Sequence, residues 1–302
     1  MSRVNSNPPD ETGFDQLLAF SLPLRNARGR VVRLGPVLNT ILAAHHYPPA
    51  IQSILAEALT LTALFGGLMK DQDSQLTLQA HGDTGVIDLL VCDYRNGELR
   101  GYVRHDKEKI VGIGANPALS LLFGKAYLVI TFDLAATDQR YQGIVPLEGS
   151  SLAEACELYF AQSEQVPSLI RVAVNLDGAQ SVAGGLLVQH LAEGEEGRER
   201  LHVRMEHPEW EHVAALTGSI RHHELVDPAL SLEGLIWRLF HEESELRATP
   251  GAIVTQGCRC SIEHYRSVLL RFPPEDRESM RDSDGTIPVD CAFCSKIFRI
   301  DT

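Results

Sequence analysis

The spacing of hydrophobic residues changes from helical to strand-like within the first part of the chain. Residues 36–45 (PVLNTILAAH) and 50–69 (AIQSILAEALTLTALFGGLM) carry apolar side chains at helical spacing, and the turn HYPP separates them. From residue 74 the period is two, as in SQLTLQAHG and GELRGYVRH, which is typical of β-strands with one buried face. The dipeptide of Asn96 and Gly97 predicts a tight hairpin turn at the start of the second of these segments, GELRGYVRH.

The same mixture of strands and helices continues to about residue 190. Strands that are joined by short turns pair antiparallel, so the sequence predicts an α+β fold in which helices pack against an antiparallel sheet. A helix is expected at 151–164, where Ser151 can cap the first turn. We assign residues 1–193 to this first domain. The further expected strands lie at 29–35, 85–93, 126–134, 139–148, 168–176 and 182–191.

Helical spacing returns after residue 193 on an acidic background. Residues 209–220 and 230–243 are expected to form amphipathic helices. Residues 193–250 contain 13 acidic and 6 basic side chains, a net charge of −7. We therefore expect a charged helical linker at 194–250 and a separate small domain at 251–302.

Bulk composition places the chain among soluble globular proteins. Its 302 residues are 44% hydrophobic and 22% charged, and this length allows about two domains. The N-terminus lacks the build of a signal peptide, and the charge-free apolar run at 58–69 is shorter than the roughly 20 residues that cross a bilayer. We therefore expect a cytoplasmic protein without a membrane partner. The net charge of −13 disfavours a nucleic-acid partner.

No pattern of catalytic residues stands out, so we expect that the protein is not an enzyme. The glycines at 112–126 (GIGANPALSLLFGKA) lack the spacing of a phosphate-binding loop. Cys92 lies in a strand pattern and Cys156 on a helix face, where a thiol usually serves as a small buried apolar group. The histidines near the linker lack the order of a metal-binding helix, which favours solvated positions.

Four of the six cysteines lie in the last 45 residues of the chain. Cys258 and Cys260 form a C-x-C pair, and Cys291 and Cys294 form a C-x-x-C pair after a 30-residue gap. Two such pairs supply the four thiolates that zinc takes in tetrahedral coordination, and zinc can fold a segment too small to bury its own core. His264 is a possible substitute ligand. The sequence predicts a zinc site at these four cysteines.

The site allows more than one role. A purely structural zinc is the usual case. However, C-x-C is rarer than C-x-x-C, and a disulfide across it would close a small strained ring that is easily reduced, which suits a reversible switch. A module that reads DNA is disfavoured, because residues 251–302 contain seven basic and eight acidic side chains.

With these motifs the chain resembles the redox-regulated bacterial chaperones of the heat shock protein 33 family. The resemblance is carried by the spacing of the four cysteines, by LIWRLFHEE at 235–243 and by AAHHYPPAIQSILAEALTLTALF at 43–65. It covers essentially the whole chain. The acidic stretch at 194–212 departs from the family by its greater length.

The resemblance implies an ATP-independent chaperone, a holdase that protects unfolding proteins from aggregation during oxidative stress. The reduced form would hold one zinc ion per chain and be inactive. Oxidation would form the disulfides Cys258–Cys260 and Cys291–Cys294, release zinc, and let the small domain and the linker unfold. Unfolding client proteins would then bind, and the oxidised protein would form a homodimer. The alternative is a regulatory or protein-binding module that zinc stabilises without redox cycling.

Overall fold

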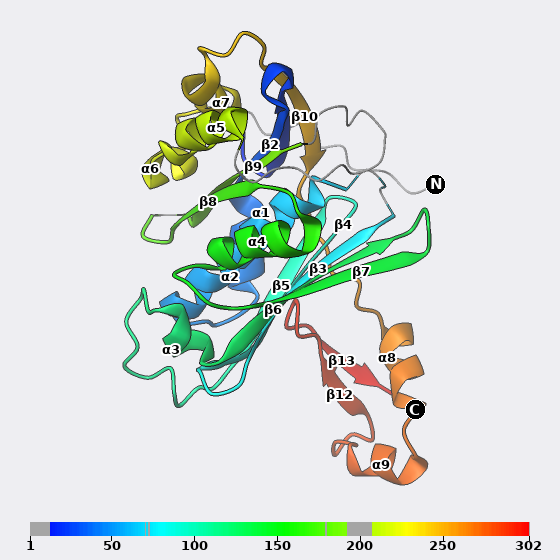
Figure 1. The fold of residues 1–302 in the computed structure, drawn as a ribbon. Helices are drawn as coiled ribbons and strands as arrows, with labels where there is room; N and C mark the ends of the chain where they lie inside the picture. Colours follow the sequence, from blue (N-terminus) through cyan, green and yellow to red (C-terminus); the bar gives the residue numbers. More distant parts are fainter. Residues whose placement is uncertain (1–12, 70, 72, 179, 192–206, 302) are drawn as a thin grey trace.

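The computed structural model describes residues 13–69, 71, 73–178, 180–191 and 207–301. These residues form two large β-sheets with helices between and outside them, and a small C-terminal unit that projects from one side (Figure 1). All strand pairs but one are antiparallel. The predicted α+β fold, with a helical segment and then a small C-terminal cysteine-bearing unit, is confirmed.

The first sheet, sheet A, has five strands, and two of them were not expected from the sequence. The segment QLLAFSL forms β1, although no strand was predicted there. Residues 247–253 form β10, although the end of the linker was expected to be helical. All seven residues of β10 are exposed, so its shape follows from backbone pairing with β1 and not from a hydrophobic pattern. The strand order is β10 (Arg247–Ile253), β1 (Gln16–Leu22), β2 (Ala27–Leu34), β9 (Val182–His190) and β8 (Ser168–Asn175).

The second sheet, sheet B, contains the alternating segments of the sequence pattern. Asn96 and Gly97 both adopt positive φ angles, of 50° and 80°, in the hairpin between β4 and β5, as the turn signal predicted. The short strand β11 pairs with β5 in parallel. The strand order is β11 (Thr255–Gln256), β5 (Glu98–His105), β4 (Ile87–Arg95), β3 (Gln75–Gly82), β6 (Ala126–Leu134) and β7 (Gln139–Pro146).

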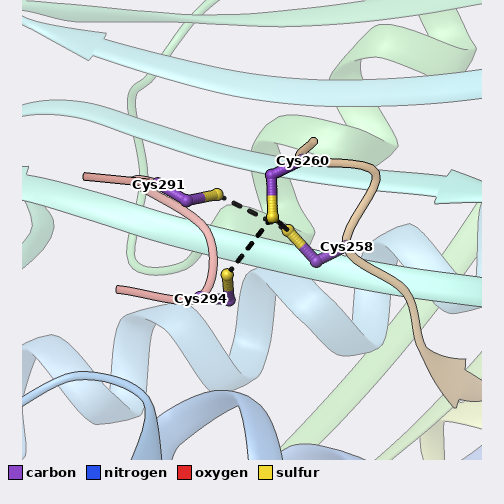
Figure 2. Close-up of side chains that lie close together, drawn as sticks. All are labelled: Cys258, Cys260, Cys291 and Cys294. Atoms are coloured by element: carbon purple, nitrogen blue, oxygen red, sulfur yellow. Dashed lines mark hydrogen bonds between the residues drawn. The ribbon is translucent and has the colours of Figure 1, made fainter. Parts of the chain in front are cut away.

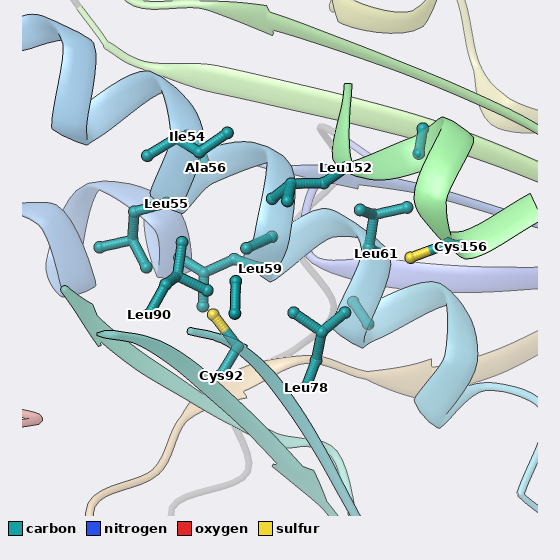
Figure 3. Close-up of a cluster of buried hydrophobic side chains, with 14 of the residues drawn as sticks. Ile54, Leu55, Ala56, Leu59, Leu61, Leu78, Leu90, Cys92, Leu152 and Cys156 are labelled. Carbon is teal, nitrogen blue, oxygen red and sulfur yellow. The ribbon is translucent and has the colours of Figure 1, made fainter. Parts of the chain in front are cut away.

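The main hydrophobic core lies between the two sheets and is built around α2 (Pro49–Gly66) (Figure 3). This helix is apolar on nearly all sides, because it contacts strands of both sheets. Among the described residues it is the one helix long and apolar enough to cross a membrane, and 78% of it is buried within the fold. Cys92 and Cys156 point into this core and are completely buried, which raises the pKa of both thiols.

A second hydrophobic cluster covers the other face of sheet A (Figure 1). It is formed by the helices α5 (Pro208–Gly218), α6 (His222–Val226) and α7 (Leu232–Phe240). Arg33 of β2 is completely buried here and donates hydrogen bonds to the backbone carbonyls of Leu225 and Leu230, at 2.8 and 2.7 Å. Beside it, a Cβ on Gly184 would lie 2.1 Å from the carbonyl oxygen of Leu225, so only glycine permits this close approach.

The remaining elements are short. Ser151 caps α4 by accepting a hydrogen bond from the backbone amide of Glu154, and the expected helix at 151–164 ends in a π-helical turn. The acidic stretch at 194–212 lies largely outside the described residues, as does the predicted start of the linker at 194. These elements are a 3-10 turn (Pro23–Arg25), α1 (Pro36–Ala43), α3 (Leu119–Phe123), α4 (Leu152–Tyr159), the π turn (Phe160–Glu164), α8 (Ile262–Leu269), α9 (Pro274–Ser279), β12 (Ile287–Asp290) and β13 (Ile297–Ile300).

The carboxyl group of Glu57 connects α2 to the start of α4 and gives a testable pH dependence. Its Oε1 accepts a hydrogen bond from the backbone amide of Ala153 at 3.0 Å, and burial raises its pKa from 4.5 to about 7. The folded form is therefore favoured while the group is protonated, and this stability is lost as the pH rises from 4.5 to 7. Because the side chain keeps some contact with solvent, we expect a loss of about 2 kcal/mol.

Urea unfolding of the wild type and of Glu57→Gln between pH 4.5 and 8 tests this expectation. The amide oxygen of the variant can still accept the bond from Ala153, but it cannot ionise. The free energy of unfolding of Glu57→Gln should therefore depend less on pH than that of the wild type. Parallel pH profiles for the two proteins would refute the assignment.

Candidate metal centre

The four C-terminal cysteines, which form a C-x-C and a C-x-x-C motif in the sequence, lie close together in the structure (Figure 2). Their Sγ atoms all lie within 4.8 Å of one another. Within the group, Sγ of Cys258 lies 3.3 Å from that of Cys260 and 3.5 Å from that of Cys291, and Sγ of Cys260 lies 3.7 Å from that of Cys294. All four are free thiols. Four sulfur ligands at such separations could hold a metal ion.

Local backbone structure positions each pair. Cys258 and Cys260 follow directly after β11, at the edge of sheet B. Cys291 and Cys294 lie in the turn between β12 and β13, where the carbonyl of Cys291 accepts hydrogen bonds from the amides of Cys294 and Ser295 at 3.3 and 2.8 Å. Ser295 adopts a positive φ of 55°, which lets the chain reverse within three residues. The turn thereby presents two sulfur atoms on the same side.

The unit that carries these thiols has a very small hydrophobic core. Tyr265 of α8 packs on the ring of Phe298 at 5.2 Å between centroids and partly covers this core. A segment of this size seldom stays folded on apolar burial alone, and a metal bound by four thiolates commonly supplies the missing stability. The buried residues of this cluster are Leu269, Ile287, Cys291, Phe298 and Ile300.

The thiols do not ionise equally. Burial opposes ionisation of Cys291, but hydrogen bonds from the hydroxyl of Tyr265 and from the backbone amides of Cys294 and Phe293 lower its pKa to about 6. Burial and the hydrogen bond with Cys258 raise the pKa of Cys260. The lowered pKa makes the Cys291 thiolate readily available to a metal ion.

His264, which the sequence offered as a substitute ligand, is not part of the sulfur cluster among the described residues. Its ring packs against Tyr265 at 5.6 Å, and its backbone amide donates to the cap residue Ser261. Two residues to which the sequence analysis gave no role are close to the centre. Arg259 and Phe293, which lie between the cysteines of the two pairs, both contact the first domain. In the sequence, only their position inside the C-x-C and C-x-x-C motifs could have indicated that they lie close to the centre.

The geometry predicts which thiols a metal ion needs. Reduced protein should bind about one metal ion per chain, and Cys258→Ser or Cys294→Ser should lower the affinity severely, because three thiolates leave an open coordination position. Cys92→Ser is the matched control, since Cys92 is buried in the main core and far from the centre in sequence. Metal content measured by elemental analysis checks the prediction. A reduced wild-type protein without metal, or a Cys92→Ser variant that loses it, would contradict the assignment.

Comparisons with known proteins agree with this arrangement. The Hsp33 protein family matches residues 15–301 of the chain. A 33 kDa chaperonin of Caulobacter vibrioides is 37% identical over 302 residues, which cover 97% of either protein. A 33 kDa chaperonin of Yersinia pestis is 32% identical over 291 residues, which cover 96% of this chain and 93% of that protein.

The fold also has a counterpart among solved structures. The crystal structure of the 33 kDa chaperonin (heat shock protein 33 homolog) of Thermotoga maritima superimposes with a TM-score of 0.77 over 95% of both chains, at 22% identity. At this identity the likeness concerns the fold alone. The family match over nearly the whole chain and the two relatives decide the assignment. The chain belongs to the Hsp33 protein family.

Proposed function

We propose that the protein is a redox-regulated, ATP-independent chaperone that binds unfolding proteins in the cytoplasm during oxidative stress. Membership of the Hsp33 family and the name of its relatives, 33 kDa chaperonin, support a chaperone function. The observation that carries the redox part is the cluster of four free thiols in a unit with very few buried apolar residues. Such a unit has to lose its fold when its thiols are no longer available to a metal.

The metal that we propose is zinc, one ion per chain in the reduced form, with Cys258, Cys260, Cys291 and Cys294 as ligands. Zinc binds thiolate sulfur at about 2.3 Å in a tetrahedron, which places neighbouring sulfur atoms about 3.8 Å apart. Three sulfur separations, of 3.3, 3.5 and 3.7 Å, are slightly shorter, and all four sulfurs lie within 4.8 Å of one another, so the thiols need little rearrangement to fit the ion. A soft donor set of four sulfurs also favours zinc over magnesium or calcium.

The oxidants that we propose are peroxide-like or chlorine-type, and hydrogen peroxide illustrates the reaction. One thiol attacks a peroxide oxygen, the O–O bond breaks, and a sulfenic acid and water form. The neighbouring thiol then displaces the hydroxyl group as a second water, so two electrons pass from two sulfurs to one peroxide. We propose the pairs Cys258–Cys260 and Cys291–Cys294, which are the pairs that the resemblance to the Hsp33 family implies. Two disulfides leave no thiolate for zinc.

We propose that residues 194–250 act as a linker that leaves sheet A when the C-terminal unit, residues 251–302, loses its metal, while residues 1–193 stay folded. The described linker helices cover an apolar face of sheet A that includes Leu18, Phe20 and Val31. Their departure would expose this face to unfolding clients, which bind through apolar surface. Oxidised chains would then form homodimers, and neither nucleic acid nor membrane is a partner in this proposal.

The alternative is a protein-binding or regulatory module in which zinc is purely structural. It predicts that client binding does not depend on the redox state. Light scattering of a thermally unfolding client without ATP separates the two possibilities. The protein treated with peroxide at raised temperature should suppress aggregation, and the reduced, metal-loaded protein should not. A dithiol reductant should reverse the gain.

The decisive comparison is between the two redox states of the same preparation. Equal suppression by the reduced, metal-loaded form would favour the alternative. The variant Cys92→Ser should behave as the wild type in both states, because its thiol is completely buried and its pKa is raised. Zinc release, measured with a chromogenic chelator, should accompany the gain of activity.

A substitution in sheet A should loosen the linker without oxidation. In Gly184→Ala the added methyl would meet the carbonyl of Leu225, so α6 has to move away from sheet A. We expect a loss of about 1–3 kcal/mol in linker docking and a linker that proteases cleave in the reduced state. The variant should also suppress client aggregation partly without oxidant. Gly218→Ala in α5 is the matched control, because nothing lies within 4 Å of its added Cβ. Equal protease resistance of both variants and the wild type would contradict the proposed linker.

A further inference from the structure

Each cysteine pair carries, between its two cysteines, a residue that contacts the outer face of sheet B. Arg259, between Cys258 and Cys260, donates from Nη1 to Oε1 of Gln75 on β3 at 2.7 Å. Phe293, between Cys291 and Cys294, packs against residues of β5. A backbone hydrogen bond connects the two parts as well, because the amide of residue 257 donates to the carbonyl of residue 99 at 3.1 Å. The C-terminal unit is therefore held against sheet B through its two ligand pairs.

The ring of Phe293 occupies a seat made by two side chains of β5. Tyr102 meets the ring edge-on, with centroids 4.9 Å apart and an interplanar angle of 87°. The guanidinium carbon of Arg100 lies 3.9 Å from the ring centroid, in cation–π geometry. This guanidinium donates two hydrogen bonds, of 2.9 and 2.6 Å, to Oδ2 of the nearly buried carboxylate of Asp93. A residue of the first domain thus holds Arg100 in its position over the Phe293 ring.

His45, in the loop between α1 and α2, holds the backbone of the same turn. Its Nε2 lies 3.2 Å from the carbonyl oxygen of Phe293, and its Nδ1 lies 3.1 Å from Oγ of Ser295. A neutral imidazole satisfies both bonds, with Nε2–H donating and Nδ1 accepting. The ring stacks on Tyr47 at 4.7 Å, and the hydroxyl of Tyr47 bonds to the backbone of Val103 at 2.8 Å. This chain of contacts anchors His45 to sheet B.

We propose that Gln75, Arg100, Tyr102 and His45 form a docking face for the metal-loaded C-terminal unit, and that occupancy of this face slows the release of the metal. One ion bound by both cysteine pairs would fix Arg259 and Phe293 relative to each other, because each contact residue lies between two ligands. In the docked position the first domain in turn restrains the turn that carries Cys291 and Cys294. If the protein is the redox switch proposed above, the docking face would set how readily oxidation releases the metal. Only this consequence rests on the proposed function.

The test uses reduced, metal-loaded full-length protein without client or oxidant. Tyr102→Ala removes the edge-on ring contact from the first domain and leaves every cysteine in place. We expect hydrogen exchange at residues 255–260 and 291–296 to rise about tenfold, and metal transfer to a chelator to speed up by a similar factor. Tyr102→Phe keeps the ring and should stay near wild type. Tyr127→Ala is the matched control, an exposed tyrosine on the same sheet that stacks on His81.

Unchanged exchange and unchanged metal transfer in folded Tyr102→Ala would overturn the docking face. If Tyr102→Ala does not fold, Gln75→Ala decides in its place, because it removes the partner of Arg259 together with one hydrogen bond to Thr77. Unchanged protection there overturns the proposal equally. These measurements do not involve chaperone activity. A confirmed docking face in a protein whose client binding ignores the redox state would refute the proposed function alone.

Discussion

The stability of the C-terminal unit depends on four sulfur atoms. Its five buried residues form a core far smaller than the one around α2, and apolar burial alone cannot offset the entropy of ordering its residues. A structural zinc in a comparable small module contributes about 10–16 kcal/mol of binding free energy at neutral pH. Nearly all of that free energy comes from the bonds between the metal and the thiolates, which are also the groups that oxidants attack first. In the proposed function, one set of atoms would therefore serve for both stability and sensing.

The metal centre and the linker helices lie on opposite sides of the first domain, and one short segment connects them (Figure 1). β10 pairs with sheet A and β11 with sheet B. Between them Val254 is 2% exposed in the main core, and its amide donates to Asp15 at 2.6 Å. Because all residues of β10 are exposed, little besides backbone bonds holds it to β1. Loss of the C-terminal unit would thus leave β10 held mainly by its backbone bonds and by the buried Val254, while its other end continues into the linker helices.

The sequence predicted elements whose structure follows from their own residues. Alternating β3 and β5, the hairpin at Asn96 and the capped α4 all have local causes. The cysteine cluster was predictable as well, because the ligand spacing is itself a geometric requirement. β10 was missed because its strand form comes from a partner more than 200 residues away in the chain. The contacts of Phe293 with Arg100 and Tyr102 were missed for the same reason, since nothing in the sequence around Phe293 indicates which residues it contacts.

Arg33 would let the linker helices be specifically placed and still leave sheet A, as the proposed function requires. Its guanidinium donates to three backbone carbonyls of the linker, those of Glu224, Leu225 and Leu230, and burial lowers its pKa. These bonds form only when α6 has the correct position, so they select one arrangement of the linker. When the linker leaves, water can replace the carbonyls around a group that favours water, so no unpaired charge stays buried. Apolar contacts give the linker affinity for sheet A, and this polar contact gives it a unique position at a small cost to release.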